Sequence, residues 1–302
     1  MLSILIPVYA YEVGTLVHTL HQQASQLSQA WEIRLLDDAS PSHWQVSNRQ
    51  LDQLQGVYYQ ELTENVGRAK IRNLLAQQAR YDYLLFLDSD SGIDQPDFLS
   101  TYLSQLAPSR VLCGGRSYLS KPPDTAYYLH WWYGTQREVR PAGIRRQQPY
   151  AGFMTNNFVV PKSVMHHIPF DETVTTYGHE DTLFGFQLQA AGIDIQHLDN
   201  PVLHIGLDEA THWLEKQRIA IQNLYRLHRQ NPALQTQALQ WWLRLHRTGL
   251  LQFVMPFFKK KSTHWEQKLL HQHQPNLRLL DLLKIYWLEE VHQAQQSPSS
   301  LS

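Results

Sequence analysis

The stretch from Tyr83 to Asp90, YLLFLDSD, constrains the fold most. Its first five residues are apolar or aromatic without alternation, which is typical of a strand buried on both faces of a sheet. The run ends at Asp88-Ser89-Asp90, where two carboxylates would be costly to bury without a partner. Neither has an adjacent Lys or Arg in the sequence, and carboxylate oxygens suit Mg²⁺ or Mn²⁺. The stretch indicates a metal–diphosphate site, with a solvated acidic turn as the alternative.

Short apolar runs and amphipathic stretches predict the remaining elements. Strands are expected at residues 3–8, 32–36, 57–59, 83–87, 110–114, 158–160, 193–195 and 202–204, and helices at 13–27, at 65–80, after Pro96 and up to Gly192. This alternation implies an α/β fold with a mostly parallel, doubly wound sheet. Further helices are expected at 209–230 and 233–253, with Pro256 and Pro275 punctuating two more. We therefore expect a domain at 1–206 and a C-terminal helical appendage at 207–302.

Composition excludes several classes of protein. A hydrophobic content of 43% with 18% charged residues describes a folding chain, and a formal charge of −1 gives no case for nucleic acid binding. Cys113 is the single cysteine, which rules out an internal disulfide framework and fits a reducing compartment. No apolar run reaches membrane-spanning length and the N-terminus lacks signal-peptide features, so we expect a cytoplasmic protein. The tail QQSPSSLS (295–302) is expected to be disordered.

Acidic residues follow two of the predicted strands. Ligands of doubly wound sheets lie beyond the carboxyl ends of the strands, where Asp38, Asp88 and Asp90 all fall. Tyr9, within PVYA, and Asp38 could stack on and hydrogen-bond a nucleobase. Ordinary packing of the ring and helix capping by the carboxylate are the alternatives.

The segment NVGRAKIRN, residues 65–73, places basic side chains at a helix start. A glycine there, with Arg68 and Arg72 in the first turns, could meet phosphate groups. A solvated basic face is the alternative interpretation, and it is favoured for Lys70.

A second acidic pair, Glu180 and Asp181 within GHED, opens a predicted helix. A carboxylate at this place can act as a general base if it reaches an acceptor hydroxyl in a dry cleft. Helix capping is the alternative, because acids are favoured at helix N-termini. His204 follows a strand at the same sheet edge, where a neutral imidazole can complete a metal site. A hydrogen-bonded core histidine is the other interpretation.

Five motifs in this order, SILIPVYA, LLDDAS, NVGRAKIRN, YLLFLDSD and GHEDTLFG, resemble those of the bacterial-type family 2 glycosyltransferases with the GT-A fold. The resemblance covers roughly residues 1–206. It implies inverting, metal-dependent transfer from a nucleotide-sugar, most commonly a UDP-sugar, with Mn²⁺ or Mg²⁺ as cofactor. Ala10 and Ile71 stand where the family often has Asn and Ala, and neither position touches a proton or a metal.

The resemblance also implies residue roles. Tyr9 and Asp38 would hold the base, Asp90 and His204 the metal, Asp88 the ribose or metal, and Asp181, beside Glu180, would be the catalytic base. Further candidates at the donor are Pro7, Arg68, Arg72 and Ser89.

Aromatic and polar residues between the metal and base motifs suggest a wall for the sugar or the acceptor. The candidates are Trp131, Trp132, Asn156 and His179. Flat rings stack on pyranose faces, although aromatic residues are also ordinary core.

Residues 241–261 combine many aromatic and aliphatic side chains with Lys259-Lys260-Lys261. Such a segment could contact an anionic membrane that carries a lipid-linked acceptor. Packing on the catalytic domain or across a dimer is the alternative, and the sequence favours it.

Two rival functions remain. A dehydrogenase or nucleotidyltransferase would place a glycine-rich motif after the first strand, where this chain reads VYAYEVG. A non-catalytic GT-A-like module that binds nucleotide-sugars or acts as a scaffold is the other, but it leaves the retention of both acidic pairs and His204 unexplained.

Overall fold

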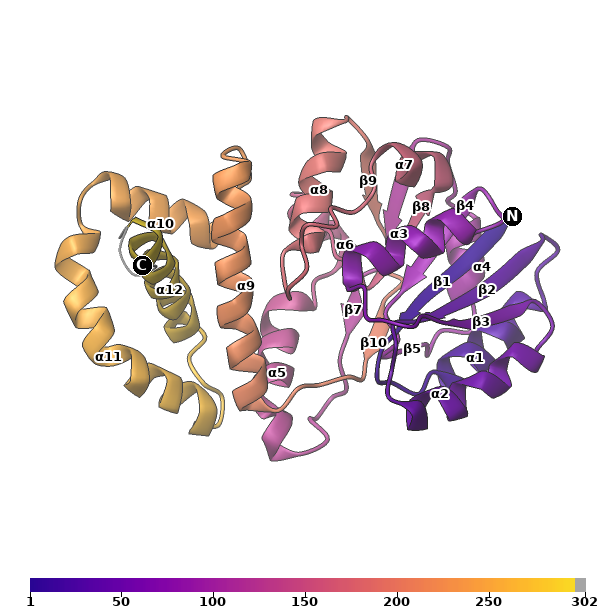
Figure 1. The fold of residues 1–302 in the computed structure, drawn as a ribbon, viewed down its shortest axis with the longest axis horizontal. Coiled ribbons are helices and arrows are strands. Elements are labelled where there is room, and N and C mark those ends of the chain that lie inside the picture. Colours follow the sequence, from indigo (N-terminus) through magenta and orange to yellow (C-terminus); the bar gives the residue numbers. More distant parts are fainter. Residues whose placement is uncertain (297–302) are drawn as a thin grey trace. The chain divides into compact units, whose positions relative to one another are not determined.

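A seven-stranded sheet is the larger of two sheets in the structure, a computed structural model that describes residues 1–296 (Figure 1). Its strands are β1 (Leu2–Val8), β2 (Trp31–Asp37), β3 (Val57–Glu61), β4 (Tyr83–Leu87), β6 (Arg110–Cys113), β8 (Asn157–Pro161) and β9 (Asp194–His197). Their order is β3-β2-β1-β4-β8-β6-β9, and β8 runs antiparallel to both neighbours. The pairs β1–β2, β1–β4, β2–β3 and β6–β9 are parallel, which confirms the predicted α/β class.

The strand order reverses around β1, which has β2 on one side and β4 on the other. In doubly wound sheets such a reversal opens a crevice at the carboxyl ends, where ligands bind. Tyr9 follows β1 and Asp88 follows β4, so both residues leave the sheet at this point.

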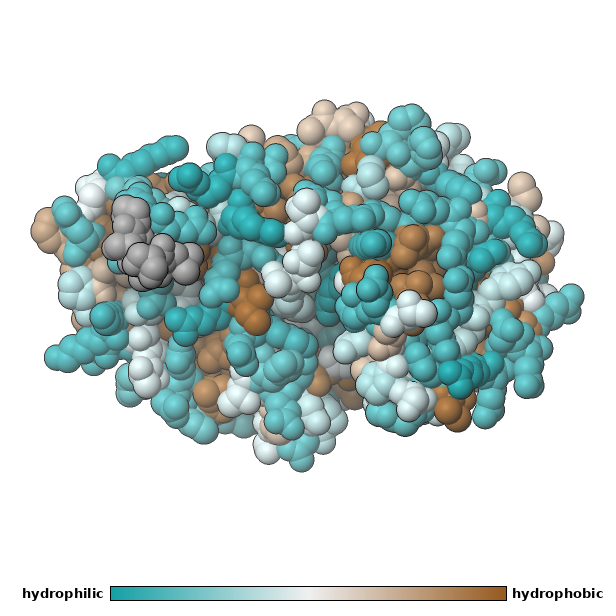
Figure 2. Space-filling model, viewed as in Figure 1, coloured by the Kyte–Doolittle hydropathy of each residue, from teal (hydrophilic) through white to brown (hydrophobic). Residues whose placement is uncertain are grey.

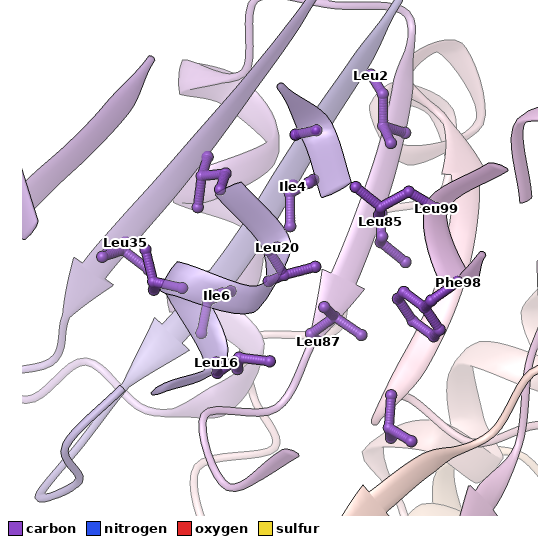
Figure 3. Close-up of a cluster of buried hydrophobic side chains, with 14 of the residues drawn as sticks. Leu2, Ile4, Ile6, Leu16, Leu20, Leu35, Leu85, Leu87, Phe98 and Leu99 are labelled. Carbon is purple, nitrogen blue, oxygen red and sulfur yellow. The ribbon is translucent and has the colours of Figure 1, made fainter. Parts of the chain in front are cut away.

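Both faces of the sheet are buried, as the unbroken apolar runs predict. On β4, Leu85 and Leu87 face one apolar cluster (Figure 3), while Leu84 and Phe86 face the other. The first cluster is closed by α1 (Gly14–Ala24) and α4 (Phe98–Leu103), and the second by α3 (Arg68–Gln78), α7 (Lys162–His167) and α8 (Glu180–Ala190). Cys113 belongs to the second cluster and is fully buried. Two short helices, α2 (Ser42–Arg49) and α6 (Ala142–Arg145), and a 3₁₀ turn at Gln50–Gln53 complete this part.

A second, three-stranded sheet has the order β5-β10-β7. It consists of β5 (Ser91–Gly92), β10 (Val202–His204) and β7 (Arg116–Ser117). β10 pairs antiparallel with β5 and parallel with β7. These strands are too short to be recognised as one sheet from the sequence, yet they join three distant parts of the chain.

The chain divides into two compact units. The first comprises Met1–Ser120, Arg137–Thr175 and Glu180–Gly206, and it contains both sheets. The second comprises Lys121–Gln136, Thr176–His179 and the residues from Leu207 onward. The chain therefore enters the second unit three times.

The second unit is helical, as predicted for the C-terminal appendage. Its helices are α5 (Tyr128–Tyr133), α9 (Ala210–Gln230), α10 (Gln237–Arg247), α11 (Leu251–His271) and α12 (Arg278–Gln296), with a 3₁₀ turn at Thr125–Tyr127. A π-helical turn at Gly134–Glu138 follows α5. The Trp242 indole N–H of α10 donates to Glu289 of α12 over 2.9 Å, which ties these helices together.

Two predicted helix limits are wrong in this unit. The helix expected at 233–253 is broken at Gly249, whose φ of 71° lies in the left-handed region that glycine adopts without strain. α11 continues through Pro256 instead of stopping there. Pro256 is near the start of α11, so the missing N–H removes one intrahelical hydrogen bond while the rest of the ladder continues.

Gln295 and Gln296 end α12, so the first two residues of the tail expected to be disordered are helical. Residues 297–302 of that tail lie outside the described residues. Across residues 1–296, no helix has both the length and the apolar character needed to cross a bilayer.

Candidate active site

The small sheet places Asp90 beside His204. Ser91, directly after Asp90, is paired with His204 in the β5–β10 register. The N–H of Ile205 donates to the carbonyl oxygen of Asp90 over 2.9 Å. As a result, Nδ1 of His204 lies 3.5 Å from Oδ2 of Asp90. Two residues that the sequence predicts to share a metal are therefore neighbours.

The surroundings of this pair restrict its movement. His204 is buried, and its ring meets the Tyr118 ring edge-on at a centroid distance of 5.4 Å. Gly206 packs so tightly against Asp90 that a Cβ at position 206 would overlap the carboxylate. Burial raises the pKa of Asp90, but the hydrogen bond and charge of His204, with Arg116 and Arg68, outweigh it and hold that pKa at about 2. Asp90 is therefore an anion at neutral pH.

Asp88 has cationic partners that the sequence order hides. Arg72 donates from Nη2 to Oδ1 of Asp88 over 2.8 Å, and Arg116 approaches Oδ2 to 4.0 Å. Arg72 is only 3% exposed in its side chain. The premise that Asp88 lacks a nearby cation holds along the sequence but not in the fold. Glu138 accepts from Arg116 over 2.9 Å and from the Tyr118 hydroxyl, which fixes the guanidinium.

The nucleobase candidates lie at the ends of β1 and β2. Asp38 is buried and accepts from the N–H groups of Val66 and Gly67 over 2.7 and 3.0 Å, so it holds the loop before α3. Desolvation raises the pKa of Asp38, and the two N–H donors oppose this rise. Tyr9 is 55% exposed, which leaves its ring open to stacking. Pro7 is partly buried within β1.

The second acidic pair opens α8. Glu180 is buried, and its Oε1 lies 3.6 Å from Nη1 of Arg68, the exposed first residue of α3. Asp181 accepts from the N–H of Thr182 over 2.7 Å. Burial raises the pKa of Asp181 most, Glu180 raises it further, and the result is about 6. A carboxyl with such a pKa can accept a proton at neutral pH.

Arg116 connects the two acidic pairs. Its charge acts on Asp88, Asp90 and Asp181, which come from two different motifs. Although burial lowers the pKa of Arg116, Glu138 and the neighbouring acids raise it well above its usual value, so it remains a cation. Asp88 and Asp90 of one motif and Asp181 of the other are therefore influenced by the same guanidinium charge.

Three buried polar groups near Asp88 have no hydrogen-bond partner among residues 1–296. They are Nε of Arg72, Nε of Arg116 and the side-chain amide of Asn156. Asn156 adjoins Asp88, because its carbonyl oxygen accepts from the Asp88 N–H over 3.1 Å. Buried polar groups without a hydrogen-bond partner are costly and uncommon. At the carboxyl ends of the strands they indicate a place where polar groups of a ligand bind.

The other donor and acceptor candidates are placed as follows. Ser89 is partly exposed between the two aspartates. Trp131 and Trp132 belong to α5 of the second unit, where the Trp132 indole donates to the carbonyl oxygen of Pro275 over 3.1 Å. His179, with φ of 67°, lies in a segment that also belongs to that unit. Contact of these three with a sugar stays a prediction.

A metal ion would find two protein ligands here. Within the described part of the chain, no three His, Cys, Asp or Glu side chains are grouped as a metal site. Asp90 and His204 nevertheless offer an anionic oxygen and an imidazole nitrogen side by side, which suit Mn²⁺ or Mg²⁺. Such ions are commonly held by one or two protein ligands, with substrate phosphates and water completing the shell. The residues present fit that mode of binding.

Sequence reasoning missed Arg116, Glu138, Tyr118 and Gly206. Arg116 follows two glycines after β6, and a basic residue at a strand end could have been noticed. The other three act through tertiary contacts, which no local pattern announces.

Comparison with known proteins supports this description. Residues 3–168, more than half of the chain, match the family model described as Glycosyl transferase family 2. No curated protein matches the sequence.

Solved structures share the fold. A mannosyltransferase, PcManGT from Pyrobaculum calidifontis in complex with GDP-Man and Mn²⁺, has a TM-score of 0.57 at 13% identity, over 99% of this chain and 76% of that chain. S. aureus TarS 1–349 has a TM-score of 0.52 at 17% identity, over 99% of this chain and 93% of that chain. Its complex with UDP-GlcNAc has a TM-score of 0.51 at 16% identity, over the same shares of the two chains. A match to a longer TarS chain spans 39% of that chain. At these identities the likeness establishes a shared GT-A fold.

Proposed function

This chain belongs to glycosyl transferase family 2, and from that premise we propose that it moves a sugar from a nucleotide-sugar to an acceptor hydroxyl with inversion. Membership makes it a glycosyltransferase and argues against the non-catalytic alternative. The metal dependence, the base and the acceptor are the finer parts of the proposal.

The observation that carries the proposal is the convergence of acidic residues on Arg116. The charge of one partly buried guanidinium, that of Arg116, acts on Asp88, Asp90 and Asp181, although these belong to two motifs far apart in the chain. The carboxyl ends of the strands carry several carboxylates, a neighbouring imidazole and polar groups without hydrogen-bond partners. This set of groups suits a phosphorylated ligand that binds together with a cation.

Asp90 and His204 would hold a divalent cation together with the donor diphosphate. When bound, the cation supplies positive charge that stabilises the departing diphosphate. Arg68 is the better placed of the two basic candidates for a phosphate, because it is exposed while Arg72 is buried against Asp88. The Mn²⁺ and GDP-Man in the similar mannosyltransferase support this assignment.

The donor base would stack on Tyr9 and lie near Asp38. Since both oxygens of Asp38 accept backbone N–H groups, the carboxylate has a fixed orientation and can still accept from a base, each oxygen having two lone pairs. Uracil is the base we propose, and the UDP-GlcNAc complex of TarS supports a UDP-sugar.

Asp181 would take the proton from the acceptor hydroxyl. The acceptor oxygen then forms its bond to the anomeric carbon while the bond from that carbon to the diphosphate oxygen breaks, and the nucleoside diphosphate leaves with the electron pair. Attack from the face opposite the leaving group inverts the anomeric centre through an oxocarbenium-like transition state. The side-chain amide of Asn156, buried and unsatisfied next to Asp88, would bind a sugar hydroxyl.

The acceptor we propose is a glycan or a lipid-linked saccharide of the cell envelope. A cytoplasmic location would give the enzyme access to nucleotide-sugars.

The test is release of nucleoside diphosphate from a panel of nucleotide-sugars, with Mn²⁺ or Mg²⁺ and a saccharide acceptor. Asp181→Asn should lower turnover by about 10²- to 10⁴-fold, because the amide cannot accept the proton. Binding of the nucleotide, measured by calorimetry, should be nearly unchanged. Glu215→Gln, an exposed change on α9, is the matched control and should keep the parent rate. An Asp181→Asn variant that turns over at the parent rate shows that the base is another residue.

A further inference from the structure

Exposed apolar side chains gather where α10 meets α11. Leu250 is 49% exposed, Phe253 73% and Phe257 54%, and we call these three the α10–α11 corner. Trp241, half exposed on α10, lies under the guanidinium of Arg244 at 5.4 Å. Scattered exposed apolar residues are ordinary, and the face seen in Figure 2 is mostly hydrophilic with small separate hydrophobic patches. The corner differs from such scattered residues, because it exposes three large apolar side chains within eight residues of the chain.

One face of α11 is buried and the other is exposed. Leu251, Phe258, Trp265 and Leu269 are buried, and the helix packs on α12. Phe253, Phe257, Lys260 and His264 recur at three- and four-residue intervals and are all exposed, so they form one outward stripe. This stripe is apolar in its first turns and basic after them.

Basic side chains outnumber acidic ones in the segment that contains the corner. Residues 231–271 carry six basic side chains against one acidic side chain, a formal charge of +5, whereas the whole chain has −1. The basic residues are Arg244, Arg247, Lys259, Lys260, Lys261 and Lys268, and the acid is Glu266. Basic side chains beside exposed rings on one helix are typical of segments that lie in the interface of an anionic membrane.

We propose that the α10–α11 corner docks on an anionic lipid surface. Phe253 and Phe257 enter the boundary between headgroups and acyl chains, and Lys259-Lys260-Lys261 meet the lipid phosphates. The proposal stands on the second unit alone and does not depend on the proposed function.

Charge distinguishes this occupant from a second copy of the chain. A two-fold contact through the corner would bring Lys259-Lys260-Lys261 of two copies together, which like charges oppose. Nucleic acid would satisfy the lysines, but it would leave the apolar corner without an apolar environment. A lipid surface satisfies both halves of the stripe.

The experiment is co-sedimentation of the full chain with vesicles. The parent should sediment with vesicles that mix phosphatidylcholine and phosphatidylserine, and remain in solution with phosphatidylcholine alone. Added salt should weaken binding without abolishing it, because screening affects the charges but not the buried rings.

Two variants separate the contributions. Phe253→Ser with Phe257→Ser keeps every charge and should weaken binding about tenfold or more. Lys259→Gln, Lys260→Gln and Lys261→Gln together keep the rings and should remove the preference for anionic lipid. Val46→Ser, an exposed apolar change on α2, and Arg140→Gln, an exposed basic change, are the matched controls and should bind as the parent does. Since all these side chains are exposed or partly exposed, each variant should keep the parent's circular dichroism.

Four outcomes would overturn the proposal. The parent could stay in solution with anionic vesicles. The Phe variants could bind as tightly as the parent. Sedimentation velocity could instead reveal a dimer that the Phe variants abolish, or a nucleic acid could bind the chain while vesicles do not. Transfer to a soluble acceptor is measured separately, so failure here leaves the proposed function untouched.

Discussion

The environment of Asp181 sets the pH range in which it can act. Its pKa is raised to about 6, first by burial and second by the neighbouring Glu180. A base must be unprotonated, and below that pKa the neutral carboxyl dominates. We expect kcat/KM to fall about tenfold per pH unit below about pH 6 and to level off above about pH 7. A pH series of initial rates measures this acid limb.

Glu180→Gln provides the control for that profile. Removing the adjacent negative charge lowers the pKa of Asp181, so the acid limb should move to lower pH. A limb that keeps its midpoint in the variant would mean that another group titrates.

For individual residues, the sequence predicted the acidic side chains but not their partners. Asp90 and His204 were expected to meet, and they do at 3.5 Å. The cations around Asp88 were not expected, because Arg72 comes from the preceding helix and Arg116 from a later strand. Pairing across a fold depends on topology, which the neighbours of a residue in the chain do not reveal.

At the element scale, the small sheet β5-β10-β7 assembles the site, and Gly206 closes it. Because a Cβ at 206 would overlap the carboxylate of Asp90, Gly206→Ala should push Asp90 away from His204. We expect metal-dependent turnover to fall about 10- to 100-fold while the circular dichroism stays that of the parent.

Gly143→Ala is the matched control for that change. Gly143 lies in α6, and an added Cβ there would meet no atom within 4 Å. The control should keep full turnover and change the free energy of unfolding by less than about 1 kcal/mol, since Gly143 lies in the first turn of a four-residue helix. Full turnover in Gly206→Ala would show that this contact does not position Asp90.

Helices and strands with a strong hydrophobic pattern could be predicted from the sequence, and those with a weak pattern could not. The buried runs of β1 and β4 have no alternation, and both strands lie in the middle of the sheet. The antiparallel direction of β8 could not be read, because a strand buried on both faces looks the same in either direction. Strands of only two residues, such as β5 and β7, carry too little pattern to detect.

For the molecule as a whole, ligand binding should raise the free energy of unfolding. A ligand that binds only the folded chain at about 100 times its Kd stabilises it by about 2.7 kcal/mol, or several degrees in Tm. We expect UDP with Mn²⁺ to raise Tm more than either does alone, as measured by differential scanning fluorimetry.

Asp90→Asn identifies the source of that shift. The variant loses an anionic metal ligand, so Mn²⁺ should no longer add to the effect of UDP, while UDP alone keeps its own. An undiminished Mn²⁺ effect in the variant would place the metal elsewhere.

The division into two units was only partly visible in the sequence. A change in composition near Gly206 marked one passage between them. The segments Lys121–Gln136 and Thr176–His179 join the helical unit from within the first two hundred residues, and nothing in their composition announces it.

The burial of Cys113 in β6 gives the molecule a built-in reporter. It is the chain's single thiol, it is fully enclosed, and burial raises its pKa, so the nucleophilic thiolate is scarce in the native state. An alkylating reagent can reach it only when the strands around it separate. The rate at which Cys113 is alkylated, followed by mass spectrometry, therefore measures how often the sheet opens spontaneously. No engineered label is required.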